Sequence, residues 1–371
     1  MGFRDYYRQF DDIDEAKLNL ERRERRRREK AAALERAPDI DLSGTEWPEL
    51  PHSEIVNAAI ARARGRMNGY PDRHATASRR LLAERHGLDP DQVVLGNGAA
   101  DLLHAAALAL LSDGDELVMH WPSYPLYPLL AAHAGAAPVP VENGDLPAAL
   151  SERTRAVVVC NPNDPTGTYT SSEELRSLLS SLPEEVHVLL DEALIQFQDA
   201  EETDACLRLV DDFPRLLVVR TFSKIYGLSG LRAGYAVGSD ARLLAATAPV
   251  LGVNAMTQAA VEHALRNGDA EIERRRRAVA RERTVLTEKL RELGADVTES
   301  QANFLWIRVR DLSGDQLATG LRRQGVIVAP GGPLGEDHHI RAAIRDQAAS
   351  NRLLRAIENL RPGSGQAPAR P

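Results

Sequence analysis

The sequence predicts an α/β fold, with a large domain built on a mostly parallel central sheet covered by helices and a small α+β domain at the C-terminal end. The chain has 371 residues, of which 43% are hydrophobic, enough for a large core. This length is typical of about two domains. Short apolar runs alternate with helical patterns up to about residue 254, an order that favours parallel strands. Beyond that point, a long helical stretch precedes a second, shorter set of strands and helices.

Each expected element rests on its own pattern. The strands of the large domain are short apolar runs rich in Val and Leu, at 93–95, 116–120, 157–160, 186–190, 216–220 and 233–237. Its helices have apolar residues at helical spacing, at 100–111, 124–133, 172–180 and 241–248. In the C-terminal part, the same criteria give helices at 270–293, 315–324 and 348–360 and strands at 304–309, 326–329 and 339–344.

These patterns divide the chain into four segments. We expect a charged N-terminal helical arm at 1–36 and a large domain at 37–268. The long helix and the small C-terminal domain follow at 269–361, and a disordered tail rich in Pro and Gly ends the chain at 362–371.

Composition excludes several classes of function. The net charge is −8, from 46 basic and 54 acidic residues, which argues against a nucleic-acid partner. No apolar run reaches the roughly 18 residues that a membrane helix needs, so we expect no membrane partner. The first thirty residues are charged throughout, unlike a secretory signal. Cys160 and Cys206 form no CxxC pair, which favours the reducing cytoplasm and predicts no metal site.

One lysine stands out from the basic residues. Of the 46 basic residues, 42 are arginines and only four are lysines. Lys224 follows an apolar run, in the segment Thr-Phe-Ser-Lys-Ile-Tyr-Gly. A lysine amine can lose its proton and act as a nucleophile, whereas a guanidinium stays protonated. Lys224 is therefore a candidate nucleophile, with an ordinary surface lysine as the alternative.

Three features together indicate one cofactor. Asp191 follows a buried strand, at the edge of an α/β sheet where ligands bind. The strand 216–220 leads into Ser223, Lys224 and a glycine-bearing loop that ends at Arg232, and a hydroxyl with an arginine suits a phosphate. The turn Gly96-Asn-Gly98 opens a helix whose free N–H groups form a phosphate seat. A phosphate seat, a nucleophilic amine and a carboxylate for a ring nitrogen indicate pyridoxal phosphate.

The chain resembles the fold-type-I, class I/II aminotransferases over roughly residues 38–361, and is most similar to the histidinol-phosphate aminotransferase group. The most specific match is Thr221-Phe-Ser-Lys224-Ile-Tyr-Gly-Leu-Ser-Gly-Leu-Arg232-Ala-Gly-Tyr. The segments Asn68-Gly-Tyr70-Pro, Asn161-Pro-Asn-Asp164-Pro-Thr-Gly and Asp191-Glu-Ala follow the family's order and spacing.

This resemblance implies a role for each matched residue. Lys224 would bind pyridoxal 5'-phosphate covalently and then carry the substrate's α-proton, while Asp191 would pair with the ring nitrogen. The phosphate would be held by Thr221, Ser223, Arg232 and the backbone of Ala99 and Ala100. Tyr124 would stack on the ring, although a tyrosine of the core is the alternative. Arg341 would bind the substrate carboxylate, and Tyr70 would reach the phosphate of a partner subunit, giving a homodimer with shared active sites.

The sequence departs from the family at the ring oxygen of the cofactor. Asp164 stands where the family usually has Asn, and Leu194 stands where it usually has Tyr, so both usual donors are missing. A slippage of one residue would let Asn163 substitute. Asp164 remains a candidate cofactor-binding residue. Arg345 binds either a second acidic group of the substrate or only solvent.

The resemblance implies an enzyme that moves an amino group between an amino acid or amino-alcohol phosphate and a 2-oxo acid, by a ping-pong mechanism. The alternative is a decarboxylase, lyase or cyclase on the same scaffold, because a fold does not determine a reaction.

Overall fold

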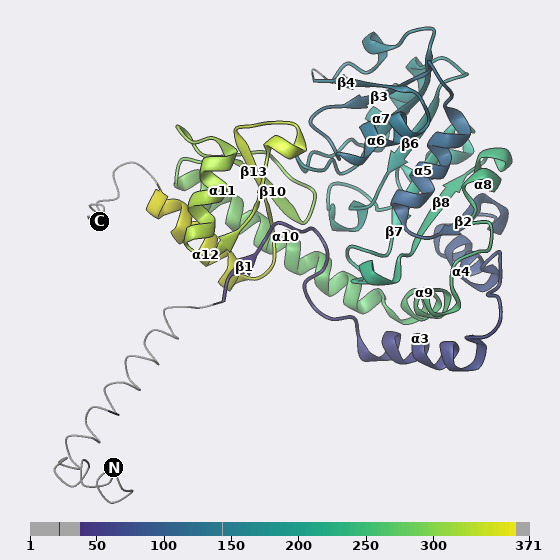
Figure 1. Ribbon diagram of the computed structural model, residues 1–371, viewed down its shortest axis with the longest axis horizontal. Coiled ribbons are helices and arrows are strands. Elements are labelled where there is room, and N and C mark those ends of the chain that lie inside the picture. Colours follow the sequence, from purple (N-terminus) through teal and green to yellow (C-terminus); the bar gives the residue numbers. More distant parts are fainter. Residues whose placement is uncertain (1–21, 23–37, 143, 361–371) are drawn as a thin grey trace, which may run out of the picture. The chain divides into compact units, whose positions relative to one another are not determined.

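The computed structural model describes residue 22, residues 38–142 and residues 144–360 (Figure 1). Apart from Arg22, the expected N-terminal arm lies outside the described residues, as does the expected tail at 362–371. Residues from Asp41 onward belong to one unit. No helix among the described residues combines the length and apolar character that crossing a membrane requires.

A seven-stranded sheet with the order β2-β8-β7-β6-β5-β3-β4 carries the site (Figure 1). Its strands are β2 (Val93–Gly96), β3 (Glu116–His120), β4 (Ala137–Val141), β5 (Thr154–Cys160), β6 (His187–Asp191), β7 (Leu216–Thr221) and β8 (Gly234–Gly238). Only β8 runs antiparallel to its neighbours, β2 and β7. The mostly parallel sheet predicted from the sequence is confirmed. The strand patterns missed β4, whose prolines Pro138 and Pro140 are tolerated because β4 lies at the sheet's edge.

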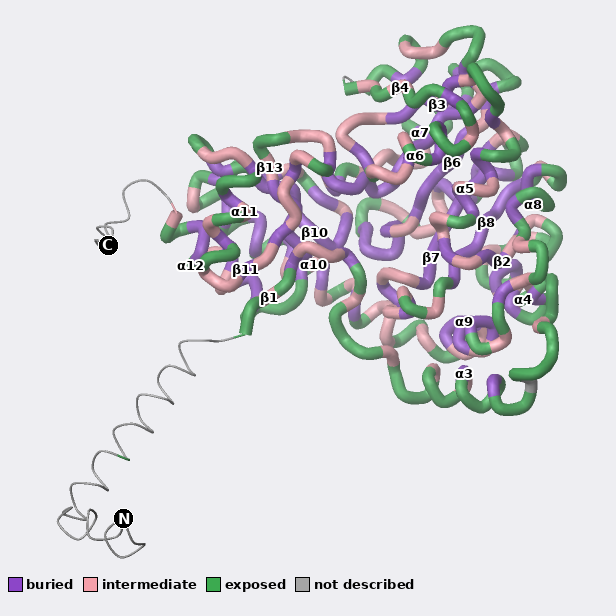
Figure 2. Tube along the Cα trace, viewed as in Figure 1, coloured by how far each residue is buried: buried purple, intermediate pink, exposed green. Residues whose placement is uncertain are grey.

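The central strands β6 and β7 are buried except at His187, the first residue of β6 (Figure 2). Apolar residues of α5 (Ala99–Leu110), α6 (Leu126–His133) and α8 (Ala241–Thr247) pack with sheet residues such as Val158, Leu189 and Val219 in one core cluster. Covering helices explain why the strands read as continuous apolar runs. The helix α7 (Ser172–Ser181) begins at a capping box, in which Ser171 and Glu174 bond to each other's backbone N–H groups.

Three helices were not expected from the sequence. They are α3 (Ser53–Arg66), α4 (Thr76–His86) and α9 (Ala255–Asn267). Helix α3 packs against α9, and α9 packs against α4. Helix α3 mixes small, apolar and charged residues, so its pattern is weakly amphipathic, and its contacts with α9 support the helix instead.

The C-terminal part is built on a four-stranded antiparallel sheet with the order β12-β13-β10-β9. Its elements are α10 (Asp269–Glu292), β9 (Asp296–Val297), β10 (Phe304–Arg308), α11 (Gly314–Arg323), β12 (Ala329–Pro330), β13 (His339–Ala343) and α12 (Gln347–Leu360). Two further short strands are β1 (Ile40–Asp41) and β11 (Val326–Ile327). The single strand expected at 326–329 is wrong, because β12 pairs with β13 whereas β11 lies outside that sheet.

Candidate active site

A cavity of about 290 Å³ lies where β5, β6 and β7 end and α5 begins. All the site residues predicted from the sequence line this cavity, except Tyr70 and Arg341. They come from five separate stretches of the chain, between residues 99 and 232. The parallel strands bring these stretches to one edge of the sheet, the usual position of ligand sites in such folds.

One side of the cavity is suited to an anion. Helix α5 begins after Gly98, which provides no side-chain cap, so N–H groups of the first turn remain free as donors. Gly98 has a φ of 100°, and a Cβ there would lie 2.6 Å from Nη2 of Arg232. Arg232 itself has a φ of 53°, in the left-handed region that non-glycine residues rarely adopt. The backbone thus brings the guanidinium next to the start of α5.

Two hydroxyl groups complete this anion cradle. The Thr221 hydroxyl donates to Oγ of Ser223 at 3.0 Å, and it accepts from the Ser223 N–H at 3.0 Å. The Arg232 guanidinium donates to the Ser229 carbonyl at 3.0 Å through Nη1. Hydroxyl, guanidinium and helix N–H donors together form a set that binds phosphate.

Asp191 is buried at the end of β6. Its carboxylate accepts from the Tyr127 hydroxyl at 2.9 Å and from the Ala193 N–H at 3.0 Å. Burial raises the pKa of Asp191, while these two hydrogen bonds act in the opposite direction. Both donors are neutral, so a protonated ring nitrogen in the cavity would supply the positive charge that a buried carboxylate needs.

Lys224 directs its amine toward a residue that the motifs did not indicate. Its Nζ donates to Oγ1 of Thr45, 179 positions earlier in the chain. Burial lowers the pKa of Lys224, against the opposing effect of the Asp164 carboxylate. A lowered pKa increases the fraction of neutral, nucleophilic amine. The Thr45 carbonyl accepts from Nδ2 of Asn303 at 2.9 Å, so the C-terminal part of the chain also positions Thr45.

Arg341, on β13, lies beside the cavity and binds Asp164 through Nη1. Its Nη2 donates to the Ser43 carbonyl at 2.9 Å. The sequence placed both charged residues in the site, but only the structure shows that they pair. Arg345 is exposed and reaches the Asp41 carbonyl at 3.5 Å, as expected of a surface arginine.

The Asn163 side chain, the alternative donor to the cofactor, binds protein groups in this structure. Its Nδ2 donates to the Pro122 carbonyl at 3.1 Å and to Oγ1 of Thr166 at 2.8 Å. Its Oδ1 accepts from the Ser123 hydroxyl at 2.7 Å. The amide is therefore fully engaged away from the cavity. Leu194 does line the cavity, but its side chain has no donor to offer.

The remaining predicted residues differ in their surroundings. Tyr124 lines the cavity and is 39% exposed, so it is not a tyrosine of the core. Tyr70 is 82% exposed and lines a separate cavity of about 520 Å³, together with Met67, Leu251 and Met256. Within the described chain, the structure does not bring Tyr70 to the anion cradle.

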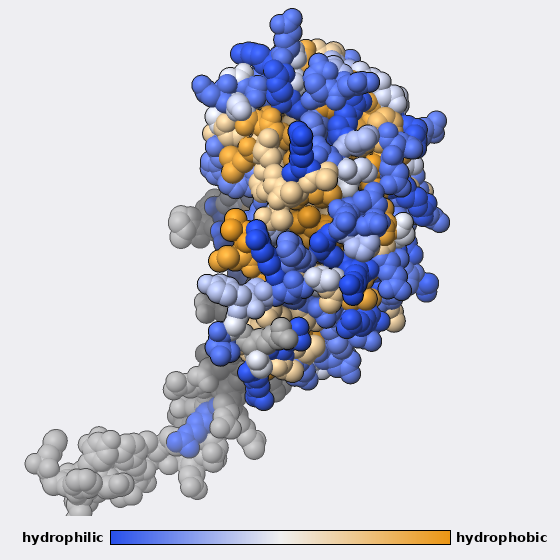
Figure 3. Space-filling view, turned by 90° about the vertical axis from the view of Figure 1, so that its right-hand side faces the viewer, coloured by the Kyte–Doolittle hydropathy of each residue, from blue (hydrophilic) through white to orange (hydrophobic). Residues whose placement is uncertain are grey.

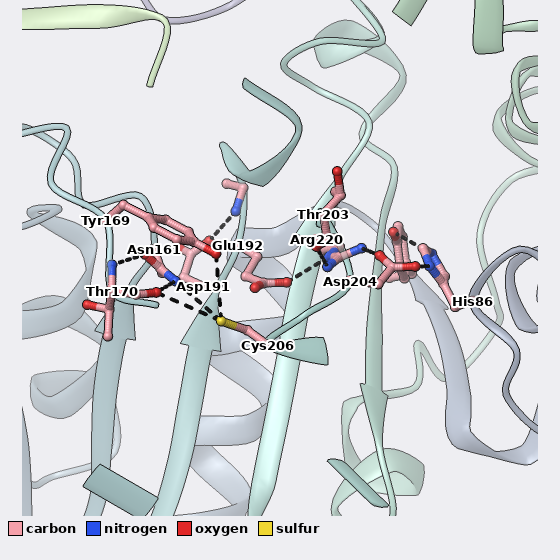
Figure 4. A network of polar contacts seen from close by, with 12 residues as sticks. His86, Asn161, Tyr169, Thr170, Asp191, Glu192, Thr203, Asp204, Cys206 and Arg220 are labelled. Atoms are coloured by element: carbon pink, nitrogen blue, oxygen red, sulfur yellow. Dashed lines mark hydrogen bonds and ion pairs between the residues drawn. The ribbon is translucent and has the colours of Figure 1, made fainter. Parts of the chain in front are cut away.

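A network of charges, centred on the buried pair Arg220 and Glu192, lies next to the strand end that carries Asp191 (Figure 4). Arg220 on β7 donates to Glu192 at 2.7 Å through Nε and to Asp204 at 2.6 Å through Nη1. Asp204 contacts Nδ1 of His86 at 2.8 Å, and Nε2 of His86 lies 3.0 Å from the Tyr235 hydroxyl. Because Glu192 directly follows Asp191, this network fixes the position of the carboxylate at the cavity. No short motif could have indicated it, since its members are far apart in sequence.

Residues 38–357 match the family model described as aminotransferase class I and II. The chain belongs to this family. It is 38% identical over 332 residues to an aromatic amino acid aminotransferase of Corynebacterium jeikeium, covering 84% of this chain and 86% of the relative. It is 35% identical over 330 residues to histidinol-phosphate aminotransferase 1 of Nitrosococcus oceani, covering 86% and 88%. This aminotransferase therefore uses pyridoxal phosphate, on which its family depends.

Solved structures support the fold-type-I architecture of the aminotransferase. The histidinol-phosphate aminotransferase of Clostridium acetobutylicum matches with a TM-score of 0.77 and 23% identity, over 86% of this chain and 98% of that one. The Sinorhizobium meliloti enzyme, in complex with pyridoxal-5'-phosphate, matches with a TM-score of 0.76 and 24% identity, over 88% and 93%.

Proposed function

We propose that the 290 Å³ cavity is the site in which this aminotransferase binds its cofactor and exchanges amino groups between substrates. The observation that carries the proposal is the combination found there: a lysine amine with a lowered pKa, a buried carboxylate and an anion cradle. These three groups match the aldehyde, the ring nitrogen and the phosphate of pyridoxal phosphate. Two observations support the fit between these residues and the cofactor. The donors in the cradle are of the kind that binds phosphate, and position 98 is a glycine, where a Cβ would contact the Arg232 guanidinium.

The bound cofactor supplies an electron sink for the carbanion formed at the substrate's α-carbon. Lys224 holds the cofactor and then takes and returns the proton at that carbon, a task favoured by a lowered pKa. Asp191 keeps the ring nitrogen protonated. Thr221, Ser223, Arg232 and the N–H groups of Ala99 and Ala100 bind the phosphate. Tyr124 would stack on the ring, and Asp164 lines the same cavity next to Arg341.

Arg341 binds the carboxylate of the substrate, because a planar guanidinium fork suits that group. The amino donor is an aromatic amino acid or histidinol phosphate, the substrates named in the relatives. The acceptor is a 2-oxo acid. These assignments rest on similarity and on the position of Arg341 beside the cavity.

The active enzyme is a homodimer with shared sites. Tyr70, Met67, Val250 and Leu251 are each more than 60% exposed, a high value for apolar side chains. Figure 3 shows apolar side chains at the surface of the face that lies on the right-hand side of Figure 1, where α4 and α8 are. A second copy would cover Tyr70 and let it reach the phosphate cradle of its partner. We also place the enzyme in the cytoplasm, where the free thiols of Cys160 and Cys206 stay reduced.

Borohydride reduction of the purified holoenzyme tests the central assignment. Peptide mapping should then find the cofactor on Lys224, and Lys224→Arg should abolish both the label and the turnover, because a guanidinium cannot form the bond. Lys289→Arg is the control and should keep both. A panel of amino donors, with keto acid formation as the readout, identifies the substrate. A label on Lys289, or carbon dioxide released without keto acid, would contradict the proposal.

A further inference from the structure

The ion pair between Asp164 and Arg341 is the starting point. The two residues are 177 positions apart, on the loop after β5 and on β13, and both are buried. The guanidinium of Arg341 uses Nη1 for Asp164 and Nη2 for the Ser43 carbonyl at 2.9 Å. Its Nε is buried and has no partner among the described residues. Both terminal nitrogens are thus engaged by the protein itself.

These existing contacts of Arg341 weaken its binding of a substrate carboxylate. A guanidinium binds a carboxylate best with two parallel N–H donors. Here a substrate carboxylate must displace Asp164 from Nη1, or bind beside it and bring two negative charges together. In a buried site such repulsion is stronger than in water. An asparagine at position 164 would impose neither cost.

The other charged residues around the cavity provide no alternative ligand for the substrate carboxylate. Arg341 lies beside the cavity, and Lys224 and Arg232 are the cations among the described residues that line it. Lys224 donates to Thr45, and Arg232 belongs to the anion cradle. Two further carboxylates, Glu46 and Asp191, also line the cavity. Among the described residues that line the cavity, no cation is therefore free of a protein partner.

We propose that Asp164 is a specificity-determining residue, an internal carboxylate that competes with the substrate carboxylate for Arg341. This inference rests on the proposed function of Arg341. The competition weakens the binding of substrates with a carboxylate on the α-carbon, relative to amines that lack one, such as amino alcohols and their phosphates. Discrimination between the two classes then depends on one charge at position 164.

Calorimetric titration of the holoenzyme tests this with two matched probes, 3-phenylpropionate and its neutral amide, 3-phenylpropionamide. Asp164→Asn keeps the shape of the side chain and removes its charge. We expect it to bind 3-phenylpropionate at least about tenfold more tightly, the usual worth of one charge-assisted hydrogen bond. Binding of the amide should change by less than about twofold. Asp164→Ser provides a second variant with the same expected direction.

Glu46→Gln is the matched control, since Glu46 lines the same cavity while Asp164 is the carboxylate that binds Arg341. It should change the affinity for 3-phenylpropionate much less than Asp164→Asn does. Equal gains in both variants would point to the overall charge of the cavity and overturn the competition. Equal gains for the carboxylate and the amide in Asp164→Asn would overturn it as well.

Arg341→Gln separates this proposal from the one it rests on. If Arg341→Gln weakens binding of 3-phenylpropionate but Asp164→Asn does not strengthen it, the competition is wrong and the role of Arg341 stands. If Arg341→Gln leaves that binding unchanged, the assignment of Arg341 as the carboxylate ligand fails. If both effects occur, combining the two substitutions should abolish the gain from Asp164→Asn.

Discussion

At the scale of single residues, Lys224 is tuned by its neighbours. Burial lowers the pKa of its amine, the Asp164 carboxylate raises it, and the Arg341 guanidinium lowers it. Asp164 and Arg341 bind each other and act on the Lys224 pKa in opposite directions, with Asp164 having the larger effect. The two residues that we assign to the substrate carboxylate thus also influence the nucleophile.

A pH series on cofactor-free protein tests this tuning. The rate at which pyridoxal phosphate attaches to Lys224 should rise with pH as the amine loses its proton, with a midpoint below the ordinary lysine pKa of 10.5. Asp164→Asn removes a charge that raises this pKa and leaves the opposing Arg341 charge without its partner. The midpoint should therefore move to lower pH, as followed by stopped-flow absorbance. An equal or higher midpoint in the variant would show that Asp164 does not act on Lys224.

At the scale of elements, the start of α5 decides how tightly the phosphate binds. Gly98 combines a φ of 100° with a position where a Cβ would come within 2.6 Å of the Arg232 guanidinium. Gly98→Ala should strain the turn and displace Arg232. A cost of about 1–3 kcal/mol corresponds to a cofactor affinity about 5- to 150-fold weaker.

Gly87→Ala is the control for backbone strain, because Gly87 has a φ of 68° with open space around it, at the end of α4. Both variants should lose stability, but only Gly98→Ala should lose affinity for pyridoxal phosphate in an equilibrium titration. If the two variants bind the cofactor equally well, the start of α5 is not the phosphate seat.

At the scale of the whole molecule, the charge network around Arg220 stabilises the fold. Arg220→Met should leave Glu192 buried without a counter-charge, at a cost of about 3–5 kcal/mol in the free energy of unfolding. Arg208 forms an exposed pair with Glu202, so Arg208→Met should cost less than about 1 kcal/mol. Urea denaturation of the cofactor-free variants measures both. Equal losses would mean that the buried network is no more important than a surface pair.

The proposed shared active site predicts complementation between two inactive subunits. Lys224→Ala removes the nucleophile, and Tyr70→Phe removes the hydroxyl that we assign to the partner's phosphate cradle. When both lesions are severe alone, a mixed dimer should recover one intact site and part of the activity. Verified mixed dimers without activity would contradict the sharing of Tyr70 between subunits.

The expectations from the sequence were most accurate where the information is local. The strands before Asp191 and Lys224 and the turn at Gly98 are continuous segments, and the structure brings their residues into one cavity as the spacing suggested. Strand β4 was missed because its prolines obscure the pattern, and α3 because its support comes from α9.

What the sequence by itself determined is therefore the α/β architecture and the chemical groups of the site, since apolar periodicity and short motifs depend on neighbouring residues. Only the tertiary structure decided which groups contact one another. Thr45 meets Lys224 across 179 positions, and Asp164 meets Arg341 across 177. Such contacts arise when the packed sheets bring distant segments together, and no local pattern encodes them.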